Sequence, residues 1–195
     1  MYPFEIHLTT AALSSARLAG FVAACAHLQA KPLLIELARG SSPVQPMLGK
    51  VVHAPDLVAA LALAATDATY LQQQGFPATR TKIETTARYP QLATPAAGPG
   101  FRPYFEWHGK VPYQHPAELR ALCEQHGAHL SANALRGAAA TRFVTLREFG
   151  PAPDFERRVA ALATALAPRW PLLKQEAECC LYDSNTALDA GWLTT

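Results

Sequence analysis

The stretch Phe4-Glu5-Ile6-His7 is matched near the middle of the chain by Phe105-Glu106-Trp107-His108, 101 residues further on. Each copy alternates apolar and polar side chains, which is typical of a strand with one buried face. A second match joins Lys82-Ile83-Glu84 to Glu176-Ala177-Glu178, with an offset of 94 between the final glutamates. Because the two matches occur in the same order, they predict a chain built from two similar halves.

The periodicity predicts the same order of elements in both halves: strand, helix, strand, strand, helix, strand. In the first half we expect strands over 4–9, 33–37, 47–52 and 79–85, with helices over 11–30 and 54–74. The second half is expected to have strands over 101–111, 128–134, 141–149 and 172–182, and helices over 116–126 and 154–168. The stretch 47–52 is interpreted as a weaker strand at a sheet edge. This order predicts an α+β fold of tandem duplicated ferredoxin-like βαββαβ halves, with antiparallel sheets facing each other or forming one barrel.

Composition places a linker between the halves. Residues 89–100 contain three prolines and two glycines, which separates a first half at 1–88 from a second half at 101–195 that ends in a tail. Trp192 in this tail is expected to dock on the body of the protein or on a partner subunit. A homo-oligomer is therefore a candidate assembly. The chain as a whole resembles bacterial proteins with duplicated ferredoxin-like halves, a resemblance that implies no activity.

Length, charge and hydropathy exclude several classes of protein. The chain has 195 residues, half of them hydrophobic, so it can bury a substantial core. Its 17 basic and 15 acidic residues leave a net charge of +2, which argues against binding nucleic acid through phosphate contacts. The start of the chain lacks a positively charged leader, and the apolar run at 57–65 is too short to span a bilayer. We expect a cytoplasmic protein with no membrane partner.

Strand alternation gathers ionisable residues on the strand faces that point away from the helices. The first strand places Glu5, His7 and Thr9 on one face, and the other strands contribute similar sets: Arg80, Lys82 and Glu84; Tyr104, Glu106, His108 and Lys110; His129, Ser131 and Asn133; Thr145 and Arg147; Lys174, Glu176 and Glu178. A polar face in contact with solvent would explain the alternation without any site. If the two faces meet, they form a polar cleft or tunnel, and burying these charges without a purpose is costly.

The first chemistry that fits is a divalent metal site. His7, Glu84, His108 and Glu178, two from each half, are the candidate ligands, because imidazole and carboxylate suit Zn²⁺, Mn²⁺ or Fe²⁺. The sharing of His and Glu between halves is similar to the vicinal oxygen chelate group of metal enzymes, whose modules have a different element order. No close-spaced ligand motif accompanies these residues.

A second chemistry is the binding of a phosphate-bearing or other small anionic substrate. Arg80, Lys82, Lys110 and Arg147 would hold the anion, and the glutamates would hold a divalent ion such as Mg²⁺. This charge pattern resembles the tunnels of the CYTH triphosphatase family. That family opens with Glu-x-Glu-x-Lys, where this chain has Glu5-Ile-His-Leu-Thr9.

A third chemistry needs no metal. His7-Leu8-Thr9 and His129-Leu130-Ser131 resemble the His-x-Thr/Ser motifs of the 2H phosphoesterases, a bilobal and internally duplicated family. The resemblance implies that one histidine acts as base and the other as acid on a phosphodiester, while the hydroxyl groups hold the phosphate. His7 is expected in the first strand of its half and His129 in the second strand of its half, so the duplication does not relate the two.

Together these patterns predict an enzyme acting on a small phosphorylated or anionic substrate, in a metal-assisted hydrolysis. The candidate catalytic residues are Glu5, His7, Glu106, His108 and His129, and the cofactor would be Zn²⁺, Mn²⁺ or Mg²⁺. The alternatives are a metal-independent 2H-type phosphodiesterase and a non-catalytic module that binds a ligand or assembles subunits.

Overall fold

The computed structural model describes residues 1–92, 101–136 and 140–192. Its first half consists of β1 (Tyr2–Thr10), α1 (Ser15–His27), β2 (Lys31–Leu37), β3 (Val44–Ala54), α2 (Leu57–Gln73) and β4 (Ala78–Thr86). Its second half consists of β5 (Tyr104–Pro112), α3 (Pro116–Gln125), β6 (Ala128–Asn133), β7 (Thr141–Glu148), α4 (Ala152–Leu166) and β8 (Lys174–Asp183). Short 3₁₀ turns are η1 (Pro90–Leu92), η3 (Ala134–Arg136) and η4 (Thr186–Asp189). The element order predicted for each half is confirmed.

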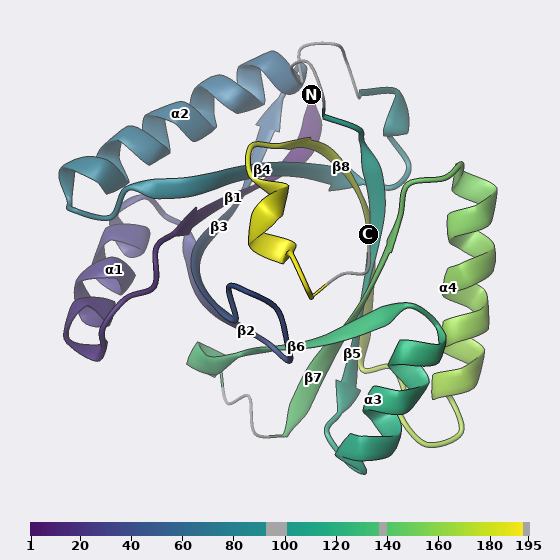
Figure 1. Ribbon diagram of the computed structural model, residues 1–195. Helices are drawn as coiled ribbons and strands as arrows, with labels where there is room; N and C mark the ends of the chain where they lie inside the picture. The colour runs from purple at the N-terminus through teal and green to yellow at the C-terminus, as the bar shows by residue number, and fades with distance from the viewer. Residues whose placement is uncertain (93–100, 137–139, 193–195) are drawn as a thin grey trace.

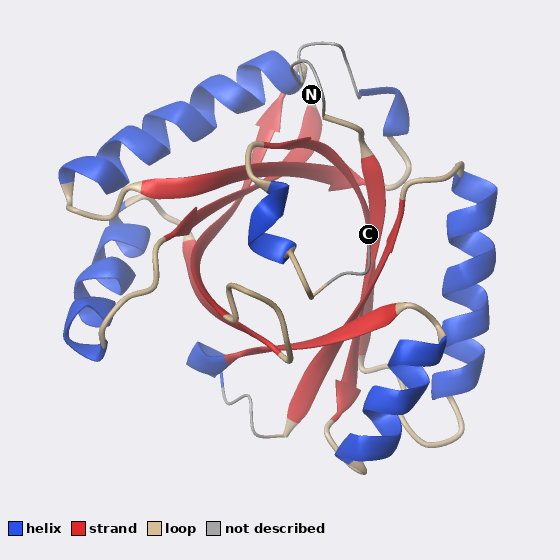
Figure 2. Ribbon diagram, viewed as in Figure 1, coloured by secondary structure: helices blue, strands red, loops and turns tan. Residues whose placement is uncertain are grey.

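The strands form a closed antiparallel barrel in the order β1-β3-β2-β6-β7-β5-β8-β4. The halves meet twice, where β2 pairs with β6 and where β4 pairs with β8. Figure 2 shows the strands as a ring with the long helices outside it, and Figure 1 shows η4 within the ring. Of the two arrangements predicted for the sheets, the single barrel is the one found.

The prediction of an edge strand at 47–52 is wrong. β3 extends from Val44 to Ala54 and pairs on one side with β1 and on the other with β2. A closed barrel has no edges among its strands, so each strand finds hydrogen-bonding partners on both sides. Within the predicted linker, Pro90–Leu92 forms η1, and residues 93–100 lie outside the described residues.

The apolar core lies between the barrel wall and the helices. Phe4, Ile6 and Leu8 of β1 are fully buried and belong to the same core cluster as Phe21 of α1 and Leu71 of α2. Full burial of a side chain of this size stabilises the fold by about 2 kcal/mol. Because side chains alternate along a strand, the residues between these three must point into the barrel.

The local sequence explains where the long helix α2 begins. Asp56 is its N-cap, and the side-chain carboxylate accepts a hydrogen bond of 2.9 Å from the backbone N–H of Ala59.

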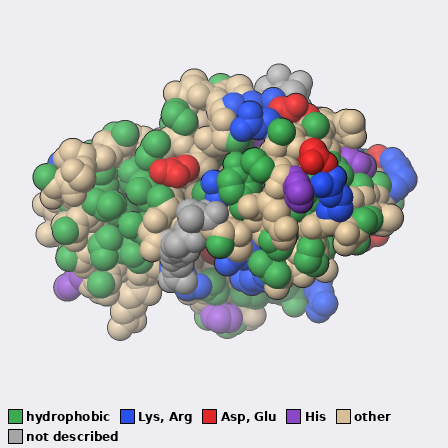
Figure 3. Space-filling model, turned by 90° about the horizontal axis from the view of Figure 1, so that it is seen from below, with side chains coloured by type: hydrophobic (Ala, Val, Ile, Leu, Met, Phe, Trp, Pro, Cys, Tyr) green, Lys and Arg blue, Asp and Glu red, His purple; other side chains and the backbone are tan. Residues whose placement is uncertain are grey.

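The helices of the first half carry few charges, and Figure 3 shows mainly hydrophobic and neutral side chains on the side of the molecule where α1 lies. No helix in the described ranges has both the length and the apolar character needed to cross a membrane.

Candidate functional site

The inside of the barrel holds a cavity of about 220 Å³ with two different walls. One wall is apolar and comes from β2, β3 and β7: Leu33, Ile35, Leu37, Met47 and Phe143. The facing strands and the tail supply ionisable residues: Glu5, His7, Arg80, Lys82, Glu84, Glu106, His108, Arg147, Glu176, Glu178 and Asp189. A cavity with an apolar wall and convergent polar groups is typical of a small-molecule site.

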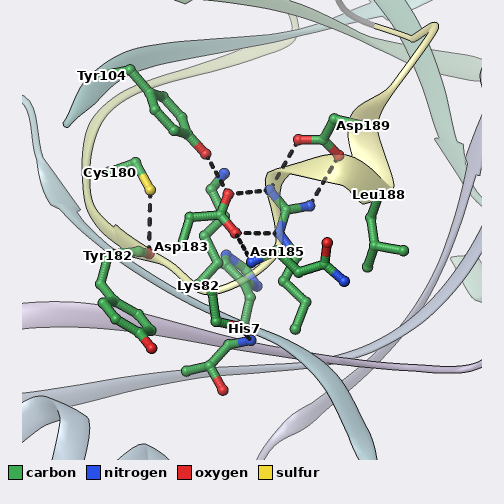
Figure 4. A network of polar contacts seen from close by, with 12 residues as sticks. His7, Lys82, Tyr104, Cys180, Tyr182, Asp183, Asn185, Leu188 and Asp189 are labelled. Atoms are coloured by element: carbon green, nitrogen blue, oxygen red, sulfur yellow. Dashed lines mark hydrogen bonds and ion pairs between the residues drawn. The ribbon is translucent and has the colours of Figure 1, made fainter. Parts of the chain in front are cut away.

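Arginines and aspartates form one end of a buried ion-pair chain. Arg80 donates to both oxygens of Asp183, at 2.8 and 2.5 Å, and to both oxygens of Asp189, at 2.9 Å each. Arg147 also reaches Asp189, with Nη2 2.7 Å from Oδ2. The hydroxyl of Tyr104 donates to Asp183 at 2.9 Å. Figure 4 shows Tyr104 reaching Asp183, with Asp189 facing it from the C-terminal segment.

The chain of charges continues toward the centre of the barrel. Arg147 Nε donates to Glu106 Oε1 at 2.7 Å, and Lys82 Nζ donates to Glu106 Oε2 at 2.5 Å. Lys82 Nζ also lies 2.8 Å from Glu84 Oε1. Positive and negative groups therefore alternate from Asp183 to Glu84, with three cations and four carboxylates. Such an alternation lets charges be buried at reduced cost.

His108 stands between two carboxylates. Its Nε2 lies 3.6 Å from Glu106 Oε2 and 3.6 Å from Glu178 Oε2. Its Nδ1 lies 3.0 Å from the hydroxyl of Thr145, which fixes the orientation of the ring. A hydrogen bond to the second ring nitrogen is the usual support of a metal-ligating histidine.

His7 repeats this arrangement in the first half, with one difference. Its Nε2 lies 3.3 Å from Glu84 Oε2 and 3.6 Å from Glu5 Oε1. In the sheet His7 stands opposite Gly49, where His108 stands opposite Thr145. The Nδ1 atom of His7 is therefore buried without a hydrogen-bond partner. The two histidines occupy equivalent places, but the second half alone supplies the supporting hydroxyl.

Glu84, Glu106 and His108 form the candidate metal centre. Each offers one ligand atom, and these atoms lie within 4.8 Å of one another. Ligand atoms around a tetrahedral Zn²⁺ ion are about 3.4 Å apart, so small movements would bring all three to one ion. Of the four ligands predicted from the sequence, Glu84 and His108 belong to this cluster, while His7 and Glu178 each contact one of its members.

The pKa values reflect the crowding of carboxylates. Burial raises the pKa of Glu178 to about 10, and the carboxylates of Glu84 and Glu5 add to this effect. Burial also opposes ionisation of Glu84 and Glu106, but nearby cations outweigh it. Lys82 and His7 hold the pKa of Glu84 at about 2, and Arg147 and Lys82 hold the pKa of Glu106 well below its ordinary value. The cavity thus has more acidic groups than its own cations can neutralise.

The cavity has an acidic entrance at one end. Glu5, Glu176 and Glu178 line both the cavity and a hollow on the outer surface. Exposure of these side chains falls inward, from 50% for Glu176 to 35% for Glu5 and 16% for Glu178. The acidic side chains of Glu5 and Glu176, outside the protonated Glu178, would attract cations and raise their local concentration. At the other end, where Arg80 lies, the C-terminal segment 184–192 lies across the opening of the barrel (Figure 1).

Lys110 and His129, both predicted as site residues, are not among the cavity-lining residues. The ammonium of Lys110 lies 5.9 Å from the centre of the Phe143 ring. His129 is buried beside Trp192, and its Nδ1 accepts a hydrogen bond of 2.9 Å from Arg39. Burial and the nearby charges of Arg39 and Arg147 lower the pKa of His129 to about 4. The other predicted residues, Glu5, His7, Arg80, Lys82, Glu84, Glu106, His108, Arg147 and Glu178, line the cavity together.

Three residues of the ion-pair network, Tyr104, Asp183 and Asp189, are not among the site residues predicted from the sequence. Asp189 lies in a single 3₁₀ turn without any periodic signal, and Tyr104 was placed on the inner face without a role. Asp183 is the last residue of β8, next to a connecting segment, and such positions often carry binding residues. Trp192 docks on the body of its own chain, with its ring N–H donating to the carbonyl of Leu130 at 3.4 Å.

Comparison with known proteins identifies no family. No family model matches the sequence, and no curated protein matches it. Among solved structures, the regulatory subunit of aspartate kinase from Thermus flavus is 14% identical, with 85% of this chain and 94% of that chain covered and a TM-score of 0.35. The small subunit of acetolactate synthase from Thermotoga maritima is 9% identical, with 91% and 93% covered and a TM-score of 0.28. Structural similarity at these identities and TM-scores gives no information about function.

Proposed function

We propose that the barrel cavity is the active site of an enzyme that acts on a small organic anion with the help of a divalent metal ion. The observation that carries the proposal is the convergence of Glu84, Glu106 and His108 inside the cavity, within 4.8 Å of one another and drawn from both halves. Carboxylate and imidazole together suit Zn²⁺ or Mn²⁺, and Mg²⁺ would need more oxygen ligands than this set offers.

The walls of the cavity define the class of substrate. Arg80 and Arg147 are the cations that would hold an acidic group, such as a carboxylate or a phosphate ester. The opposite wall, with Leu33, Ile35 and Met47, offers contact to an apolar body. The hydroxyl of Thr9 lines the same space and is buried without a partner, so it is available to the substrate. A compact organic anion satisfies both walls.

The remaining residues have roles in a metal-assisted hydrolysis. A divalent ion at the cluster would supply an activated water molecule. His7 lies beside Glu84, and its Nδ1 has no partner, so this ring can accept a proton. Lys82, between Glu84 and Glu106, would be displaced by the metal and become free to contact the anion.

The competing proposal is a non-catalytic module that binds a metabolite. It is favoured by the position of Lys82, whose ammonium already neutralises Glu84 and Glu106 at 2.8 and 2.5 Å. If this lysine is the permanent cation of the site, no metal binds. The cavity would then bind its ligand without catalysing a reaction.

Metal titration separates the two proposals. We expect the wild-type protein to bind one equivalent of Zn²⁺ or Mn²⁺ by isothermal titration calorimetry, and His108→Ala to lose at least about tenfold in affinity. His53→Ala is the matched control, because His53 is an exposed residue of β3 that does not line the cavity. Metal-dependent hydrolysis of p-nitrophenyl phosphate would then test the reaction class. Equal metal binding by both variants, or none by the wild type, would contradict the metal-dependent proposal.

A second copy of the chain is the proposed macromolecular partner. Val58 and Leu63 of α2 are 61% and 43% exposed, on a helix whose one charged residue is Asp67. Their replacement by glutamate should convert an oligomer to a monomer in sedimentation experiments. A monomeric wild-type protein would remove this part of the proposal.

A further inference from the structure

Asp189 fills a gap between two buried arginines. Its two oxygens each accept a hydrogen bond of 2.9 Å from Arg80, and one of them lies 2.7 Å from Arg147. This paired geometry is the one in which a guanidinium group binds a free carboxylate. Arg80 keeps a second partner in Asp183, and Arg147 keeps one in Glu106. Each arginine would therefore still be paired with a carboxylate if Asp189 moved away.

The numbers of buried cations and carboxylates indicate that Asp189 is the member of the network that an anion can replace. The alternating chain has three cations and four carboxylates, and without Asp189 the counts are equal. An incoming anion that took its place would restore the present arrangement, so the exchange would bury no additional charge. Asp189 also belongs to the tail and not to a barrel strand, so it can leave while all strand pairings stay intact.

We infer that Asp189 holds the place of the substrate's acidic group, and that the segment 184–192 moves out when a small organic carboxylate binds between Arg80 and Arg147. This inference rests on the proposed anion site. It adds that the ligand is a carboxylate with an apolar body, because the group now seated there is a carboxylate and the facing wall is apolar.

Contacts along its whole length hold the segment in place. At its start, Thr81 N–H donates to the Ser184 hydroxyl at 2.8 Å and Asn185 donates to the carbonyl of Thr79 at 3.2 Å. The backbone carbonyl of Ala190 accepts a hydrogen bond of 3.0 Å from Ser41 N–H, and Gln45 donates to the carbonyl of Leu188 at 3.2 Å. Gly40 lets the loop between β2 and β3 approach closely, since a Cβ there would lie 3.1 Å from both the backbone nitrogen and the Cβ of Trp192. Its φ of +115° is also a conformation that disfavours other residues. Gly40→Ala should therefore loosen the segment without altering either arginine.

Trp192 reports the position of the segment. It is 7% exposed, and Trp107 and Trp170 are buried elsewhere at 1% and 2%. Benzoate is the probe, with benzamide as its neutral control, and EDTA is present so that metal plays no part. We expect benzoate to increase acrylamide quenching of the wild-type fluorescence and benzamide to leave it unchanged. Trp192→Phe should lose this response.

The affinity of the variants completes the test. Asp189→Asn should bind benzoate about tenfold tighter than the wild type, or more, because the competing internal charge is gone. Gly40→Ala should also bind benzoate more tightly, which keeps the test open if Asp189→Asn fails to fold. Equal affinity in all proteins, binding that leaves Trp192 shielded, or no binding at all would each overturn the inference. Metal binding by the wild type together with any of these results would leave the metal centre standing.

Discussion

Replacement of Glu178 by glutamine should stabilise the protein at neutral pH. Burial, followed by the charges of Glu84 and Glu5, raises the pKa of Glu178 from its ordinary value of 4.5 to about 10. The folded protein therefore keeps a proton on this side chain that the unfolded chain releases above pH 4.5. Because the folded state binds more protons, it loses stability as pH rises from 4.5 toward 10. Glutamine has the same shape and no proton to release.

The size of the effect follows from the pH interval. Each pH unit of this linkage changes the free energy of unfolding by about 1.4 kcal/mol. Between pH 4.5 and pH 7 the cost of keeping Glu178 protonated reaches about 3 kcal/mol, an upper estimate that holds whenever the folded pKa exceeds 7. Glu178→Gln should therefore be more stable than the wild type by up to that amount at pH 7. The two proteins should be nearly equal at pH 4.5.

Urea unfolding at several pH values between 4.5 and 8 measures this difference. Glu176→Gln is the matched control, since Glu176 is two residues away on the same strand and its side chain is 50% exposed. We expect the control to follow the wild type at every pH. Stability curves for wild type and Glu178→Gln that run parallel across the range would refute the reasoning. With Zn²⁺ or Mn²⁺ bound, the metal charge lowers the pKa of Glu178, so the difference should shrink.

Other changes test the surroundings of the site. Thr145→Val removes the partner of His108 Nδ1 and should weaken metal binding by about tenfold with little change in melting temperature, as titration calorimetry would show. Gly109→Ala places a Cβ 2.2 Å from the Trp107 ring and should destabilise the fold by about 1–3 kcal/mol in urea unfolding, because the buried ring has to shift. As the pH falls from 4.5 to about 2, the wild type should lose stability, because Glu84 takes up a proton in the unfolded chain at a higher pH than in the folded protein. Glu84→Gln should lack this component in acid titrations of unfolding.

Sequence patterns predicted the parts of the structure that depend on short-range periodicity. In β1 the alternation of Phe4, Glu5, Ile6 and His7 was sufficient to separate the core face from the cavity face. The duplicated Glu-x-His pairs placed the site residues at equivalent positions in the two halves. These features can be predicted from the sequence because the alternation of side chains along a strand is fixed by its own backbone.

The partners within the site depended on information that the sequence does not display. Asp189 and Arg80 are 109 residues apart, and nothing local marks the 3₁₀ turn that brings them together. Glu106 was predicted as an acid or base, but its two oxygens are engaged by Arg147 and Lys82. Arg147 stands directly opposite Glu106 in the pair β5–β7, whereas the contact with Lys82 depends on the registers of β8 with both β4 and β5 across the barrel seam. Register between distant strands follows from the closure of the barrel as a whole.

The distribution of charge between the halves has a consequence for the fold. Arg80 and Lys82 belong to the first half, whereas their carboxylate partners Asp183, Asp189 and Glu106 belong to the second half. A first half on its own would leave Arg80 without any of these partners, and breaking a buried pair costs about 3–5 kcal/mol. The ion-pair chain therefore favours one alignment of the halves over others, since a shifted seam would separate the charges. The same residues that equip the cavity for a ligand also specify how the barrel closes.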